Sequence, residues 1–275
     1  MSEEVLKGRF ETTRGNLAKT LKWASAPFDE RYDQAWVNLQ DDELNTVANA
    51  GESVVAYNTL EDPFIQEVEL HNSIDDSAGL EAVLNVPTTE QYLDFVGGER
   101  VTVEFYGLEN ERGCTRMTLD GDLTATFYLP SSESDYESKA LQVVNRYNDE
   151  NEWITASEDT LSTSFRTRVD QFEKIVEAKE FESLALSTYP VVVEDGEFRL
   201  DATDDNERDS ISGALWAEDV EGPDVENYYT RGFAELFGNI GGEVDVMTEQ
   251  DSLITVVREN DDETICLRYS VLPAV

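Results

Sequence analysis

Hydrophobic and polar positions follow two rhythms along this chain. Short stretches with a period of two predict β-strands, and longer stretches in which apolar residues recur every three or four positions predict helices. In the first half, the predicted helices run from Thr12 or Thr13 to about Ala24 and from Thr88 to Val96. The predicted strands of this half are 35–39, 44–48, 53–57, 66–71, 101–106, 114–119 and 123–129, with Asp120-Gly121 as a hairpin turn.

The second half repeats this pattern. Its predicted helices are 168–179 and 225–240, and its turns lie at 194–196 and 260–262. Its predicted strands are 161–166, 183–187, 189–193, 197–202, 210–216, 243–248, 253–258 and 265–272. Many antiparallel strands with two helices in each half predict an α+β fold.

Two landmarks give the period of the repeat. Gly-Gly-Glu occurs at 97–99 and again 144 residues later, and Leu129-Pro130 returns as Leu272-Pro273 after 143 residues. Their agreement predicts two copies of one unit, with domains at 1–130 and 159–275. Between them, 131–158 is a mostly polar connector whose apolar middle, 141–147, is expected to dock on a sheet.

Composition sets the class of protein. The chain has 275 residues and is 40% hydrophobic and 10% aromatic, which is enough for packed cores. It contains no apolar run of about 18 residues and starts without a signal sequence, so a soluble cytoplasmic protein is expected. Cys114 and Cys266 have no metal-ligand spacing and His71 is the single histidine, so we expect neither a metal site nor a cofactor.

The net charge of −40, from 60 acidic and 20 basic residues, allows two interpretations. It could be a local surface that repels or mimics nucleic acid, or a global adaptation to concentrated salt. Acidic residues occur along nearly the whole chain and only six of the basic residues are Lys. This distribution favours a halophilic cytoplasm, where the Debye length of about 3 Å at molar salt makes crowded like charges tolerable.

The few cations are concentrated in two windows, 9–23 and 166–179, at the first predicted helix of each copy. On the first helix, Lys19 and Lys22 lie opposite the apolar face of Leu17 and Leu21. Any surface helix can have a charged outer face. Cations that persist in so acidic a chain nevertheless favour contact with phosphates. Eight of the 20 basic residues fall there: Arg9, Arg14, Lys19, Lys22, Arg166, Arg168, Lys174 and Lys179.

The order and spacing of these features resemble the DNA sliding clamp of archaea and eukaryotes, proliferating cell nuclear antigen (PCNA). The stretches that carry the resemblance are 35–40 after the first helix, 227–233 opening the last helix, and 267–273 at the end. The resemblance implies two similar clamp domains, each with two helices on antiparallel sheets, and a head-to-tail homotrimeric ring. It also implies that neighbouring copies pair through two sheet edges, one at 114–129 and the other at about 209–216.

A clamp of this kind encircles duplex DNA, touches only its phosphates, and tethers DNA polymerase and other replication or repair enzymes as a non-enzymatic processivity factor. The resemblance implies these DNA-facing residues: Arg14, Lys19, Lys22, Arg166, Arg168, Lys174 and Arg231. It also implies a clamp loader and a pocket for the short clamp-binding peptides of partner enzymes. The expected pocket residues are Ala50, Ser53, Val54, Leu141, Val143, Val144, Leu272 and Pro273, although the connector residues could equally serve only to hold the connector down.

The sequence departs from the family in three places. The second helix carries no cation, the connector is long, and Ser270 stands where an aromatic residue is expected. The acidic inner positions suggest the hypothesis that bound cations bridge carboxylates to phosphate at high salt. A host that is a halophile or a virus of one fits this composition.

Two other functions compete with the clamp. One is a metal-dependent hydrolase that uses clustered carboxylates such as those in 201–205, and the other is an acidic DNA mimic. The 201–205 cluster lacks the glycine of a calcium-binding loop and lies between predicted strands, so a solvated turn is the better interpretation. A DNA mimic needs no basic helix faces.

Overall fold

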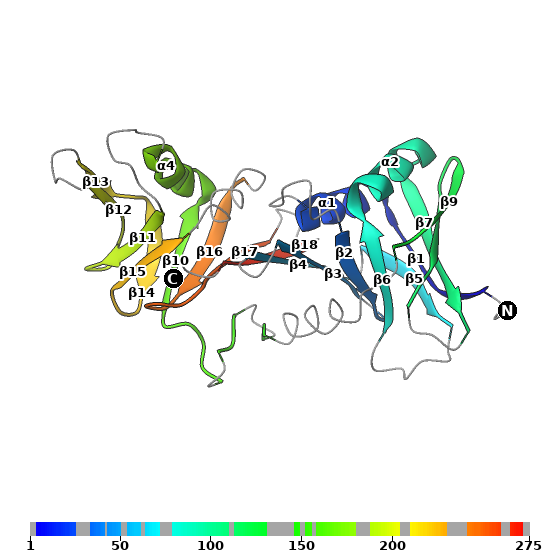
Figure 1. The fold of residues 1–275 in the computed structure, drawn as a ribbon, viewed down its shortest axis with the longest axis horizontal. Helices are drawn as coiled ribbons and strands as arrows, with labels where there is room; N and C mark the ends of the chain where they lie inside the picture. The colour runs from blue at the N-terminus through cyan, green and yellow to red at the C-terminus, as the bar shows by residue number, and fades with distance from the viewer. Residues whose placement is uncertain are drawn as a thin grey trace. The chain divides into compact units, whose positions relative to one another are not determined.

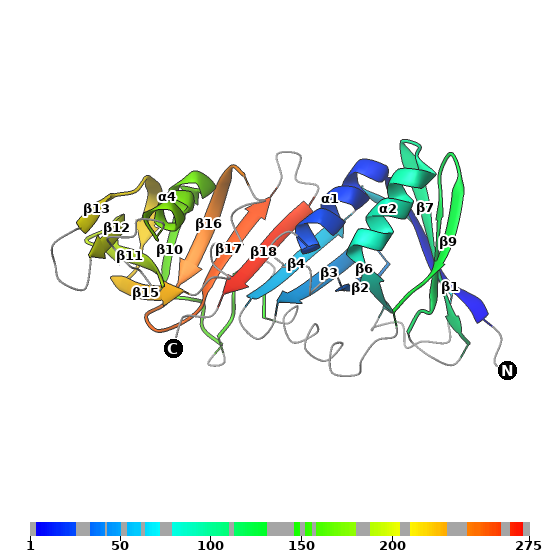
Figure 2. The same cartoon turned by 45° about the horizontal axis from the view of Figure 1, so that its top comes forward.

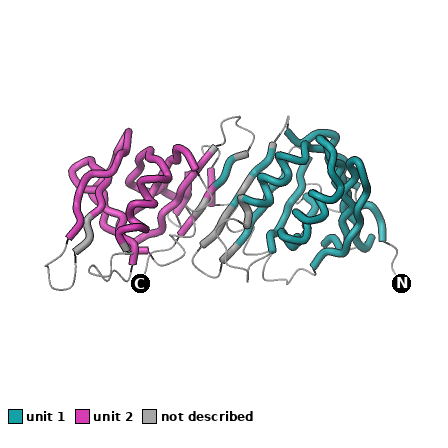
Figure 3. Tube along the Cα trace, turned by 90° about the horizontal axis from the view of Figure 1, so that it is seen from above, with its two compact units in different colours: residues 1–49, 56–144, 259–267 teal, residues 50–55, 145–258, 268–275 magenta. Residues whose placement is uncertain are grey.

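In the computed structural model, the chain packs as two compact units (Figure 3). Unit 1 comprises 1–49, 56–144 and 259–267, and unit 2 comprises 50–55, 145–258 and 268–275. The residues that the structure describes are 4–25, 34–41, 43–50, 54–61, 64–71, 79–109, 113–130, 146–148, 152–155, 158–179, 188–203, 210–229, 241–259 and 265–271.

Unit 1 contains a five-stranded antiparallel sheet and a second run of neighbouring strands (Figure 1). The sheet has the order β5 (Ile65–Leu70), β1 (Glu4–Thr13), β7 (Arg100–Leu108), β8 (Arg116–Asp120) and β9 (Thr124–Tyr128). The second run has the order β6 (Leu80–Asn85), β2 (Gln34–Leu39), β3 (Glu43–Ala50) and β4 (Val54–Glu61). Helices α1 (Arg14–Ser25) and α2 (Val86–Val96) pack beside each other (Figure 2).

Unit 2 repeats both strand orders. Each strand of unit 1 has a counterpart in unit 2 whose label is nine higher, so that β1 corresponds to β10. One run is β14 (Ala217–Glu221), β10 (Thr163–Arg168), β16 (Glu243–Thr248), β17 (Ile254–Glu259) and β18 (Ile265–Val271). The other is β15 (Val225–Tyr229), β11 (Tyr189–Glu194), β12 (Glu197–Thr203) and β13 (Ser210–Ala214). Helix α4 (Val169–Lys179) is the counterpart of α1. The α+β fold built from two similar copies is therefore confirmed.

Two strands of the repeat lie at sheet edges. Among the described strands, β13, the counterpart of β4, ends its sheet. Strand β9, the counterpart of β18, also ends its sheet. These are the two edges that the family resemblance predicts, and an edge strand leaves a row of backbone N–H and C=O groups available for pairing.

Each unit has an apolar core beneath its helices. In unit 1, Phe10 and Phe105 lie with ring centroids 6.4 Å apart, and Leu17 and Leu21 of α1 are buried as predicted. In unit 2, the ring of Phe198 lies 4.8 Å from Phe165 and 5.4 Å from Phe172.

The two cysteines differ in exposure. Cys114 is buried, and burial raises the pKa of its thiol to about 12, as expected of a core residue. Cys266 is half-buried.

The predicted helix at 225–240 is wrong at its start. Val225–Tyr229 form strand β15, which pairs with β11. Burial alternates along it, with Val225, Asn227 and Tyr229 inside and Glu226 and Tyr228 outside. The aromatic residues at helical spacing from Tyr229 onward concealed this period of two. The rest of that prediction, 230–240, and the predicted strand 183–187 lie outside the described residues.

Besides β15, three more strands were not predicted. Strand β1 carries Lys7 and Arg9 within its alternation, β6 is buried on both faces, and β14 is mostly acidic. Each lacks the plain alternation of apolar and polar residues on which the prediction of a strand depends. Their places in the sheets come from pairing with β7, β2 and β10.

Candidate nucleic-acid interface

Helix α1 carries three of the predicted DNA-contacting cations. Thr13 caps the helix, because its Oγ1 accepts a hydrogen bond from Asn16 N at 3.1 Å. Buried Leu17 and Leu21 fix the opposite face. Of the cations, Lys22 is exposed and Lys19 is half-buried.

The cations of α1 face acidic residues of α2. Arg14 Nη1 lies 3.2 Å from Asp94 Oδ1; the Asp94 side chain is largely exposed and that of Arg14 is partly exposed. The pKa of Glu90 is raised by burial and by repulsion from Asp94, and attraction to Lys22 opposes this shift. The helix pair therefore presents a mixed surface on which exposed ion pairs of modest strength compete with any phosphate.

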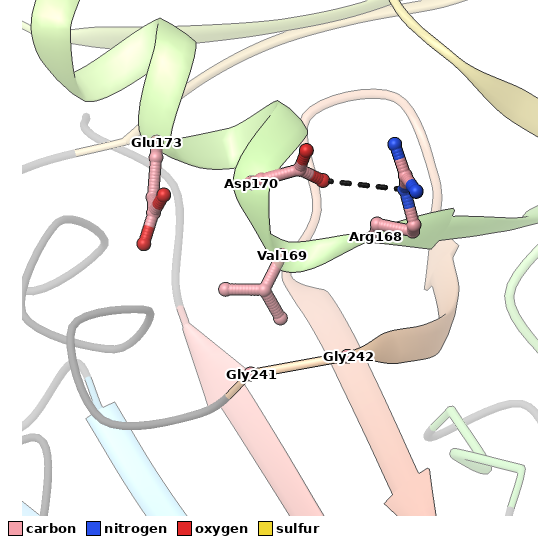
Figure 4. A pocket seen from close by; sticks show the side chains of 6 residues that line it. All are labelled: Arg168, Val169, Asp170, Glu173, Gly241 and Gly242. Atoms are coloured by element: carbon pink, nitrogen blue, oxygen red, sulfur yellow. Dashed lines mark ion pairs between the residues drawn. The ribbon is translucent and has the colours of Figure 1, made fainter.

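In unit 2, two predicted cations precede α4 on β10. Arg166 Nε lies 2.8 Å from Asp245 Oδ1, and this hydrogen bond raises the pKa of the guanidinium. Arg168 Nε lies 3.4 Å from Asp170 Oδ1 (Figure 4), and its Cζ lies 5.2 Å from the ring centroid of Trp216. Each arginine is thus held by a neighbouring carboxylate at the surface.

A shallow pocket of about 230 Å³ lies at the start of α4 (Figure 4). Its lining combines the cation of Arg168 with the acids Asp170 and Glu173, beside Gly241 and Gly242. Gly242 has a φ of +91°, and a Cβ atom there would lie 3.1 Å from Arg258 Nη2. Within the described ranges, no three His, Cys, Asp or Glu side chains are grouped so as to hold a metal ion.

The last two predicted cations are Lys174 and Arg231. Lys174 on α4 is exposed, and its Nζ donates a hydrogen bond of 2.8 Å to Gln171 Oε1. Arg231 lies outside the described residues.

Little of the predicted peptide pocket can be placed. Ala50 ends β3 and Val54 begins β4. The other six residues are outside the described part of the chain: Ser53, Leu141, Val143, Val144, Leu272 and Pro273.

The described end of the connector is anchored to β18, which directly precedes Leu272 and Pro273 in the sequence. The hydroxyl groups of Tyr147 and Ser270 are 2.7 Å apart, Arg268 Cζ lies 5.7 Å from the Tyr147 ring centroid, and the Trp153 ring meets that of Tyr147 edge-on at 5.2 Å. The hydroxyl of Ser270, where an aromatic residue was expected, therefore meets an aromatic residue of the connector.

The sequence prediction missed the partners of the cations. Asp94 is 80 residues from Arg14 and Asp245 is 79 residues from Arg166, so no local pattern pairs them. Gln171 was also missed, although a polar residue on the apolar stripe of a predicted helix is a usable signal.

The full chain can be compared with known proteins. No family model and no curated protein matches the sequence. Among solved structures, PCNA of A. fulgidus, in a complex with the C-terminal region of FEN-1, matches 98% of this chain and 99% of its own with a TM-score of 0.66 and 12% identity.

Two further structures agree. PCNA of Entamoeba histolytica gives a TM-score of 0.65 at 10% identity, covering 98% of this chain and all of its own. PCNA of Thermococcus kodakaraensis gives 0.64 at 9% identity, covering 97% of this chain and all of its own. None of the described helices is long and apolar enough to cross a membrane. From end to end, this chain has the fold of the PCNA sliding clamps.

Proposed function

We propose that this protein is a DNA sliding clamp: a homotrimeric ring that encircles duplex DNA and tethers DNA polymerase and other replication or repair enzymes, with no catalytic activity of its own. The observation that carries the proposal is the fold similarity to PCNA chains over 97–98% of this chain and at least 99% of theirs. The domain division 1–130, 131–158 and 159–275 is part of this proposal.

The strand order supports assembly from copies of this chain. Among the described strands, β13 of unit 2 and β9 of unit 1 each end their sheet. Pairing β13 of one copy with β9 of the next would make a head-to-tail contact, and such contacts close into a ring when the rotation between copies permits. Exposed Tyr128 on β9 and exposed Phe95 on α2 supply apolar surface in the same unit as this edge.

The charges support loose contact with DNA. The predicted contacts are Arg14, Lys19, Lys22, Arg166, Arg168, Lys174 and Arg231. Since Arg14, Arg166 and Arg168 are already ion-paired at the surface, each would exchange a carboxylate for a phosphate. This exchange costs little and favours sliding. In the halophilic cytoplasm that we propose, bound cations would bridge the acidic side chains to phosphate.

Partner enzymes would dock through short peptides, as the complex of A. fulgidus PCNA with the C-terminal region of FEN-1 suggests. The proposed pocket comprises Ala50, Ser53, Val54, Leu141, Val143, Val144, Leu272 and Pro273. A clamp loader and DNA polymerase are the partners expected to use it. Nothing in the described structure favours the DNA mimic or the carboxylate hydrolase over the clamp.

Mass photometry in molar KCl, combined with retention on plasmid DNA, tests the proposal. A trimer that stays on nicked circular DNA and slides off the same DNA after linearisation is the expected result, because a closed ring leaves only at an end. A monomer at every concentration, or equal retention on the two forms, would refute the clamp. Retention without dependence on the identity of the cation would remove only the bridging hypothesis.

A further inference from the structure

Gln171 on α4 is buried, yet its side chain serves two polar partners. Its Oε1 accepts a hydrogen bond from Trp216 N at 3.1 Å and one from Lys174 Nζ at 2.8 Å. Gln171 is only 2% exposed. The amide oxygen thereby links α4 to the backbone of Trp216, and loss of the bond from Trp216 N would deprive a part-buried donor of this partner.

Trp216 lies at the corner between β13 and β14. Thr167 Oγ1 donates to Trp216 O, Arg168 lies over the indole ring, and Leu215 N donates to Phe198 O at 2.8 Å. The corner directly follows β13, the strand that ends its sheet. Contacts from β10 and α4 therefore fix the position of the chain where β13, the edge strand, ends.

The other copy shows which of these contacts belong to the common architecture. In unit 1, Thr12 Oγ1 donates to Phe64 O at 2.7 Å, in the place where Thr167 meets Trp216. The counterpart of Gln171 is Asn16, one methylene shorter, and no hydrogen bond links it to Phe64 in the described structure. Within the described residues, the corner between β4 and β5 thus lacks the glutamine contact that the corner after β13 possesses.

We propose that Gln171 is a positioning residue that couples the free edge β13 to the DNA-facing cation Lys174. Pairing of β13 with a second copy of this chain fixes the Trp216 corner, and through Gln171 it holds the ammonium of Lys174 in place for a phosphate. This inference rests on the proposed clamp function. It adds a link between ring closure and DNA contact within α4.

The test compares Gln171→Met with Lys174→Met, which removes the cation alone. Two quantities are measured: the concentration at half-assembly, and the affinity for a short duplex over a series of KCl concentrations. Lys174→Met should lower the salt slope by about one and leave assembly unchanged. Gln171→Met should lower the slope to a similar extent and also raise the half-assembly concentration severalfold, while Gln171→Glu, which keeps the acceptor for Trp216 N, should retain the half-assembly concentration of the wild type.

The outcomes separate the two proposals. Suppose that the wild type forms rings and binds duplex. If Gln171→Met then changes neither the half-assembly concentration nor the salt slope, or changes the half-assembly concentration alone, the coupling is refuted and the clamp stands. The coupling is also refuted if Gln171→Met and Lys174→Met together lower the slope by the sum of their separate effects. A wild type that neither assembles nor binds duplex refutes both.

Discussion

Helices α1 and α4 occupy equivalent places in the two units, but they present opposite charge. Within its helix, α1 carries Arg14, Lys19 and Lys22 and no acid, whereas α4 carries three acids, Asp170, Glu173 and Glu177, against two lysines. In unit 2 the arginines lie instead on β10, just before the helix. In the proposed clamp, the two copies would therefore attract DNA unequally.

In the proposed clamp, most of the attraction for DNA would come from unit 1. The cations of α1 are balanced in part by Glu90 and Asp94, which belong to a separate helix, and so the face of α1 itself remains positive. On α4, by contrast, three acids and two lysines share one helix. We expect α1 to supply most of the salt-dependent affinity and α4 to need bound cations for close contact with phosphates.

The largest effect should come from the apolar anchor of α4. Phe172→Ala removes a fully buried ring that packs on Phe198, and such truncations cost about 3–5 kcal/mol. Leu17→Ala, the matched change on α1, should cost about 2–5 kcal/mol. Denaturant unfolding at constant KCl measures both free energies. A loss below about 1 kcal/mol for Phe172→Ala would contradict the packing described for unit 2.

Reversing the charge of α1 should have the next largest effect. Lys19→Glu with Lys22→Glu should lower duplex affinity roughly 10- to 100-fold and reduce the salt slope by about two, because two phosphate contacts are lost. Arg100→Glu with Arg199→Glu, on strands β7 and β12, makes the same change in net charge outside the two cation-rich windows and is the control. Equal losses in the two double variants would show that net charge, and not the helix face, governs binding.

Making α4 resemble α1 should have a smaller effect of opposite sign. Asp170→Asn with Glu173→Gln removes two carboxylates beside Arg168 and should raise duplex affinity about three- to tenfold, with a steeper salt slope. Affinity should also become less dependent on which cation is present. Titration in NaCl, KCl and MgCl₂ checks this. An unchanged affinity would mean that this end of α4 does not approach DNA.

The smallest effect concerns Glu90. Because burial and Asp94 raise its pKa above 4.5, the folded state disfavours the carboxylate, and the associated loss of stability grows as the pH rises above that value. Glu90→Gln should therefore raise the melting temperature by about 1–2 °C at pH 7. The gain should vanish at pH values below 4.5. A variant that melts lower at pH 7 would show that attraction to Lys22 outweighs burial.

Much of the fold follows from local pattern. Helix α2 begins with Asn85 as its cap, whose Oδ1 accepts from Thr88 N, and it ends at Gly97 with a φ of +68°. The hairpin turn at Asp195-Gly196 has two positive φ values. Short-range rules of capping and turn chemistry dictate such features.

The sequence by itself determined the repeat, the three described helices and the acidic background, because periodicity and composition are properties of neighbouring residues. Only the tertiary structure decided that 225–229 is a strand, since its pairing with β11 overrode the helical spacing of its aromatic residues. It also decided that Arg14 meets Asp94 and that Gln171 holds Trp216. Such partners lie tens of residues apart, and the order of the strands and the packing of the helices bring them together.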